Sequence, residues 1–152
     1  MKEYTTSSLI NASPEAVWAI LTDGPSYKEW NPEIIGIDGN FADGARVKAH
    51  VRLGDGAVRK LPQRVTLTEK PMRMQWTSGL PFGLFVGRRT FTVTPVPHGT
   101  EFRMHLRMSG PLSGPIIKSV GDRQPEIDKF SAAIKQRSEN TANAVLAVPH
   151  RP

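Results

Sequence analysis

The chain has 152 residues with a formal net charge of +6, and 38% of its residues are hydrophobic and 22% charged. This balance is typical of one globular domain and excludes a disordered chain, while no apolar run approaches the roughly 20 residues that cross a bilayer. The N-terminal segment has no apolar stretch like that of a signal peptide, so we expect a cytoplasmic protein. Because the sequence contains no cysteine, disulfides, thiolate metal sites and cysteine nucleophiles are excluded.

The first elements along the chain are predicted to be a strand, a helix and a short second helix. Residues 3–11 are rich in Thr, Ser, Leu and Ile and are predicted to form the strand. Ser13-Pro14-Glu15 is typical of a helix start, with a capping hydroxyl, a proline at the first helical position and an acid near the positive end of the helix dipole. Asp23-Gly24-Pro25 ends this helix, and a short helical turn over residues 26–30 ends at Asn31-Pro32.

The middle of the chain changes to a hydrophobic period of two, which predicts strands. After a short strand that begins at residue 35, residues 44–53 alternate cleanly between apolar and basic side chains. The same alternation recurs in residues 64–68, 72–77, 90–94 and 102–108. Short turn-rich segments join these runs, so we expect an antiparallel meander with one buried face.

The C-terminal part has a helical pattern. Residues 111–139 carry one broad apolar stripe, which Pro125 interrupts. We therefore expect a break near residues 121–125 and a stronger helix from Glu126 onward. This helix is the only predicted element long enough to cover the apolar face of a curved sheet. We expect one domain over residues 1–143 and a frayed tail over 144–152.

These elements predict an α+β fold with a curved antiparallel sheet of about seven strands, two short helices between the first two strands, and a long C-terminal helix. Together with "INASPEAVWAILTD" and "YKEWNPEI", this order resembles the SRPBCC superfamily, which includes START lipid-transfer domains and polyketide cyclase/dehydrase-like proteins. The resemblance covers nearly the whole chain. It implies a helix-grip fold, with the sheet wrapped around the long helix and a deep apolar cavity between them. The interruption at Pro125 departs from the usual continuous terminal helix.

The residues expected to contact a ligand have inward parity on the strands or lie near the predicted cavity mouth and the terminal helix. They are Tyr27, Trp30, Val51, Gln63, Met74, Trp76, Phe82, Arg89, Phe91, Met104, Leu106, Val120 and Ile127. Trp30 is expected at the mouth, with Tyr27 one turn before it on the same side. A solid core without a cavity is the alternative interpretation.

Few polar side chains have inward parity, namely Gln63, Ser78 and Arg89. Arg89 is the one weak catalytic candidate, because an inward arginine can hold a carboxylate, enolate or phosphate through paired hydrogen bonds. The alternative is that Arg89 reaches solvent past the cavity mouth. The histidines and acids are assigned to outward, turn or terminal positions, and Glu33 is expected to face solvent. We therefore expect no acid–base pair in the cavity, no metal and no cofactor.

Two surfaces suggest other interactions. The segment "SGLPFGLFVG", residues 78–87, holds apolar residues that could line the cavity mouth, contact a membrane, form a homodimer or fold back onto the core. The outward sheet face is basic but lacks aromatic residues for base stacking, so a solvated face is favoured over nucleic-acid binding.

Three functional hypotheses follow from the resemblance and the residues. The first is the binding of a hydrophobic or amphipathic small molecule in the cavity. The second is a polyketide cyclase/dehydratase-type enzyme without metal that uses the same cavity, mainly by positioning its substrate. The third is an interaction module that uses the basic face or the apolar loop at residues 80–85.

Overall fold

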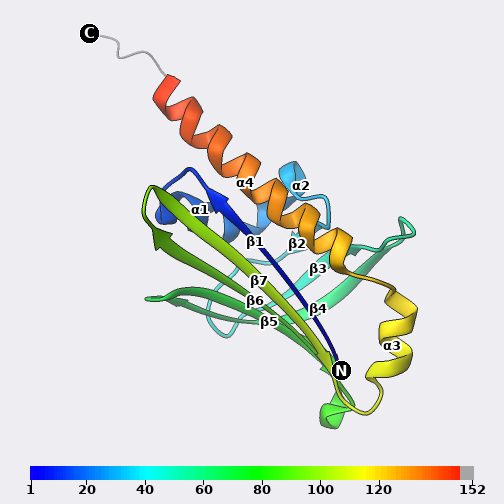
Figure 1. Ribbon diagram of the computed structural model, residues 1–152. Helices are drawn as coiled ribbons and strands as arrows, with labels where there is room; N and C mark the ends of the chain where they lie inside the picture. The colour runs from blue at the N-terminus through cyan, green and yellow to red at the C-terminus, as the bar shows by residue number, and fades with distance from the viewer. Residues whose placement is uncertain (148–152) are drawn as a thin grey trace.

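A curved antiparallel sheet forms the framework of the computed structural model, which describes residues 1–147. Its seven strands lie in the order β1-β7-β6-β5-β4-β3-β2 (Figure 1). They are β1 (Lys2–Ile10), β2 (Ile34–Asp38), β3 (Arg46–Arg52), β4 (Val58–Glu69), β5 (Met72–Leu80), β6 (Phe85–Val96) and β7 (Gly99–Ser109). The predicted α+β fold and the antiparallel meander are confirmed, with β1 closing the sheet against β7.

Two short α-helices connect β1 to β2, as predicted. The first is α1 (Pro14–Leu21), and the second is α2 (Tyr27–Trp30), with the 3-10 turn η1 (Gly24–Ser26) between them. The Ser13 hydroxyl accepts a hydrogen bond of 3.2 Å from the Ala16 N–H, so Ser13 caps α1 as its sequence predicts. A second 3-10 turn, η2 (Pro81–Gly83), lies between β5 and β6.

The C-terminal helix is divided at the predicted place. α3 (Ser113–Val120) ends at Gly121, which adopts a positive φ of 73°, and α4 (Gln124–Ala147) follows. Since a left-handed backbone strains most residues other than glycine, Gly121 suits this junction. α4 continues past residue 143, where we expected the tail to begin, and residues 148–152 lie outside the described part of the chain.

α4 lies across the concave face of the sheet, and α3 lies beside it near one end (Figure 1). Phe130 of α4 packs in an aromatic cluster. The centroid of its ring lies 5.5 Å from that of Phe91, 5.7 Å from that of Trp30 and 6.1 Å from that of Tyr27. Edge-on and tilted rings at these separations pack favourably. This part of the interior is therefore a filled core.

Candidate ligand-binding site

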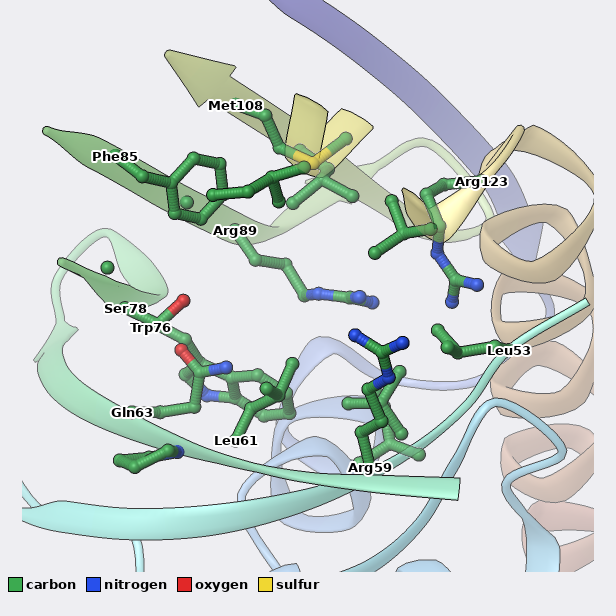
Figure 2. A pocket seen from close by; sticks show the side chains of 18 of the residues that line it. Leu53, Arg59, Leu61, Gln63, Trp76, Ser78, Phe85, Arg89, Met108 and Arg123 are labelled. Carbon is green, nitrogen blue, oxygen red and sulfur yellow. The ribbon is translucent and has the colours of Figure 1, made fainter. Parts of the chain in front are cut away.

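Beside α3 the interior is hollow instead of filled. A cavity of about 310 Å³ lies between α3 and the concave face of the sheet. Figure 2 shows side chains from several strands and from the α3–α4 junction that point into it. Much of its wall is apolar, including Ile34, Val51, Leu53, Leu106, Met108 and Val120. The structure thus contains a cavity as well as a solid core.

The residues predicted to contact a ligand fall into three groups. Those that line the cavity are Val51, Gln63, Trp76, Arg89, Leu106 and Val120. Those that pack in the filled core instead are Tyr27, Trp30, Met74, Phe91, Met104 and Ile127. Phe82 is 100% exposed and lies outside the cavity wall. Strand parity identifies the concave face correctly, but it does not tell which positions lie under α4 and which lie beside the hollow.

Glu33 was predicted to face solvent, and this prediction was wrong, because its side chain is 0% exposed. The Asn31 side-chain oxygen accepts hydrogen bonds from the backbone N–H groups of Glu33 and Ile34, at 3.0 and 2.9 Å. The pairing of β2 with β3 also shifts between Ile34 and Gly36. This capped turn and irregular register turn both Glu33 and Ile34 inward, so simple alternation fails here.

The buried carboxylate of Glu33 binds two arginines. Arg89 donates from its two terminal nitrogens to the two Glu33 oxygens, at 2.6 and 2.9 Å, in a fork geometry. Arg123 donates from Nη2 to Glu33 Oε2 at 2.6 Å. The prediction that no carboxylate points inward was therefore wrong.

The two arginines keep Glu33 ionised. Burial of the carboxylate alone would raise its pKa, but the positive charges of Arg89 and Arg123 and their hydrogen bonds outweigh burial and lower the pKa below its ordinary value. Arg89 also lies over the Trp76 ring, 5.8 Å from the ring centroid. Arg89 is therefore held on two sides, by an anion and by an aromatic face.

Arg123 has a different environment. It is only 3% exposed, and it lines the cavity. Besides the bond to Glu33, its Nη2 approaches the Arg52 carbonyl at 3.4 Å, whereas Nη1 is buried without a hydrogen-bond partner in the described part of the chain. Sequence reasoning missed Arg123, because neither strand nor helix periodicity applies to the junction between two helices.

Arg59 adds a third guanidinium group to the cavity wall. Figure 2 shows the guanidinium groups of Arg59, Arg89 and Arg123 pointing toward one another. Arg59 was not predicted, because β4 begins at Val58, several residues before the alternating pattern recognised in the sequence. Gln63 and Ser78 lie together elsewhere along the wall in the same view. The cavity thus has an arginine-rich side and an amide–hydroxyl side.

The connection between β5 and β6 lies at one edge of the cavity. Leu80 and Phe85 line the cavity, while Leu80, Phe82 and Leu84 are exposed to solvent. The Leu84 carbonyl accepts a hydrogen bond of 2.8 Å from the Leu112 N–H, which ties this connection to the start of α3. Exposed apolar side chains therefore gather beside the cavity and α3.

A curved sheet that grips a C-terminal helix around a largely apolar cavity defines the helix-grip class of ligand-binding folds. The model of the family described as "Polyketide cyclase / dehydrase and lipid transport" matches residues 1–139. The chain belongs to this family, and its resemblance to the SRPBCC superfamily is confirmed. A search of curated proteins found no significant match.

Solved structures share this fold at low sequence identity. A START superfamily protein from Mycobacterium smegmatis has a TM-score of 0.69 and 20% identity, over 91% of this chain and 98% of its own. A protein from Thermus thermophilus has a TM-score of 0.72 and 18% identity, over 93% and 99%. The Zhui aromatase/cyclase from a Streptomyces species has a TM-score of 0.73 and 11% identity, over 95% and 97%. At these identities the likeness shows the fold alone.

Proposed function

We propose that this protein binds a hydrophobic or amphipathic small molecule in the cavity beside α3. The observation that carries this proposal is the cavity itself, about 310 Å³ with a largely apolar wall and a few convergent polar groups. This volume lies at the lower end of the range of known small-molecule sites, about 300–1,000 Å³. A compact ligand, such as a single short chain or a small ring system, suits it.

The contrast with the rest of the interior supports this proposal. Around Phe130, large aromatic rings pack closely and fill the interior. Beside α3, small residues such as Ser78 and Gly87 stand on the wall instead. An empty hollow would forgo the dispersion contacts that a ligand supplies.

The enzyme hypothesis has less support from the geometry. The ionisable side chains among the described residues on the cavity wall are Arg59, Arg89 and Arg123, and arginine does not release its proton near neutral pH. Glu33, behind the wall, is ionised and engaged by two of them. A cyclase/dehydratase activity would therefore depend on positioning and on electrostatic stabilisation of the substrate. The interaction module, a homodimer and a cytoplasmic location stay predictions.

A fluorescence titration tests the proposed binding. A neutral apolar probe, N-phenylnaphthylamine, should gain fluorescence with the wild-type protein and saturate at one site. The variant Ser78→Phe should abolish this gain, because the new ring occupies the cavity. Thr77→Phe is the matched control, since the neighbouring strand residue points to the opposite face of β5. Equal probe binding by both variants would contradict a ligand site in the cavity.

A further inference from the structure

The positive charges at the cavity wall outnumber the negative charges that pair with them. Glu33 is the one carboxylate paired with both Arg89 and Arg123, so one positive charge of this buried triad remains without a counter-ion among the described residues, and the solvent-exposed Arg59 adds a second positive charge at the cavity wall. Leaving a charge uncompensated away from water is costly unless a partner completes it. The site therefore has the electrostatic character of an anion receptor.

The unmatched hydrogen bonds agree with the charge. Arg123 Nη1 and the Trp76 indole nitrogen are both buried donors without partners in the described chain, and both residues line the cavity. Neither group can accept a hydrogen bond from a ligand. A ligand group that partners either of them must therefore be a hydrogen-bond acceptor.

The hydrogen bonds of Glu33 leave Arg123, and not Arg89, with a terminal nitrogen that is able to bind a ligand. Both terminal nitrogens of Arg89 are already bound to Glu33, whereas Arg123 binds it through Nη2 alone. Glu33 thus fixes the Arg123 side chain and leaves Nη1 to another partner. Arg59, on the neighbouring wall, points toward the same place (Figure 2) and has no ion pair among the described residues.

We propose that the ligand is an amphipathic anion whose oxyanion headgroup, a carboxylate or phosphate, lies between Arg59 and Arg123, with its apolar body along Trp76, Leu106 and Val120. This inference rests on the proposed function of the cavity. Guanidinium groups bind both kinds of oxyanion through charge-assisted, paired hydrogen bonds. The Glu33–Arg89 pair is then a fixed support of the site, and the headgroup accepts the hydrogen bonds that Arg123 Nη1 has left to donate.

Matched ligands test the headgroup. Decanoate and decanamide have the same chain and nearly the same shape but differ in charge, and both are titrated as competitors of N-phenylnaphthylamine. Decanoate is expected to compete at least about tenfold more strongly, a difference of one charge-assisted contact. Monodecyl phosphate, titrated in parallel, shows whether the carboxylate or the phosphate is preferred. Equal competition by decanoate and decanamide would overturn the proposal.

Matched variants locate the headgroup. Arg59→Met is expected to weaken decanoate about tenfold and decanamide much less, because only the anion forms a charge-assisted pair with the guanidinium. Arg64→Met is the control, since it removes the same charge from the exposed, outward face of the same strand. If both variants weaken decanoate equally, the effect is that of net charge and the proposed position is wrong.

A second variant tests Arg123 without removing the partner of Glu33. Arg123→Lys keeps a positive charge near the carboxylate but loses the planar fork that supplies a second donor. It is expected to weaken decanoate several-fold more than decanamide, and thermal unfolding confirms that the variant is folded. Failure of the neutral probe to bind the wild type would defeat the proposed function, whereas probe binding without any preference for anions would defeat this inference alone.

Discussion

Glu33 and Arg89 lie 56 residues apart in the sequence and form a doubly hydrogen-bonded ion pair of 2.6 and 2.9 Å between β6 and the residue that precedes β2. The pair is buried, and Arg123 joins it from the α3–α4 junction. It therefore connects the sheet, the corner after α2 and the helical cover at one point. Mutation of the Glu33 carboxylate should therefore weaken the packing of all three elements.

The first prediction concerns Glu33→Gln. This change leaves Arg89 and Arg123 facing each other without the charge that compensates them, so we expect the free energy of unfolding to fall by about 3–5 kcal/mol. Urea denaturation followed by circular dichroism measures it. Glu29→Gln is the control, because the exposed pair of Glu29 with Arg137 contributes at most about 1 kcal/mol. Similar losses in both variants would show that the buried triad does not stabilise the fold.

A pH dependence follows from the lowered pKa of Glu33. The unfolded state binds this proton more readily than the folded state, so the stabilisation is complete above the unfolded pKa, about 4.3, and is lost as pH falls through the lower folded pKa. We expect the difference in unfolding free energy between wild type and Glu33→Gln to be constant near neutral pH and to shrink from about pH 4 downward. Urea titrations at a series of pH values check this, and a gap that widens on acidification would contradict it.

The fold was largely predictable, whereas the centre of the site was not. Alternation in residues such as Val47, Ala49 and Val51 identified the strands, and Ser13 and Gly121 marked the helix ends, because these signals are local. The inward position of Glu33 depends on the Asn31 turn and on a register shift between two strands. Such non-local geometry leaves no periodic signal in one sequence.

The distinction between core and cavity has a similar cause. Phe91 and Leu106 both have inward parity, but Phe91 packs on Phe130 while Leu106 lines the hollow. Which of these two residues contacts the covering helix α4 depends on where α4 begins and on the direction in which α3 leaves it. That is set by Gly121 and by the tie between Leu84 and Leu112, and strand parity contains no information about it.

The aromatic cluster gives a prediction for the filled core. Phe130 is fully buried and contacts Trp30, Phe91 and Phe102. Phe130→Ala should lower the free energy of unfolding by about 3–5 kcal/mol, because it removes these contacts and leaves a cavity. Leu9→Ala, at an exposed position of β1, should change it by no more than about 0.5 kcal/mol. Thermal and urea unfolding measure both, and a loss below about 1 kcal/mol in Phe130→Ala would contradict the packing described.

Phe82 gives the last prediction, which concerns backbone strain beside the cavity. Its side chain is 100% exposed, and its backbone has a φ of 61° and a ψ of 24°, a left-handed conformation that costs a residue other than glycine roughly 1–2 kcal/mol. Phe82→Gly should relieve this cost, and after the greater freedom of unfolded glycine is subtracted, stability should be unchanged or up to about 1 kcal/mol higher. Leu84→Gly is the matched control, because Leu84 has an ordinary φ of −59° and its substitution brings the entropic loss without any relief of strain. Differential scanning calorimetry should therefore place the Tm of Phe82→Gly at or above that of the wild type and the Tm of Leu84→Gly below it; the reverse order would show that the left-handed turn is not strained.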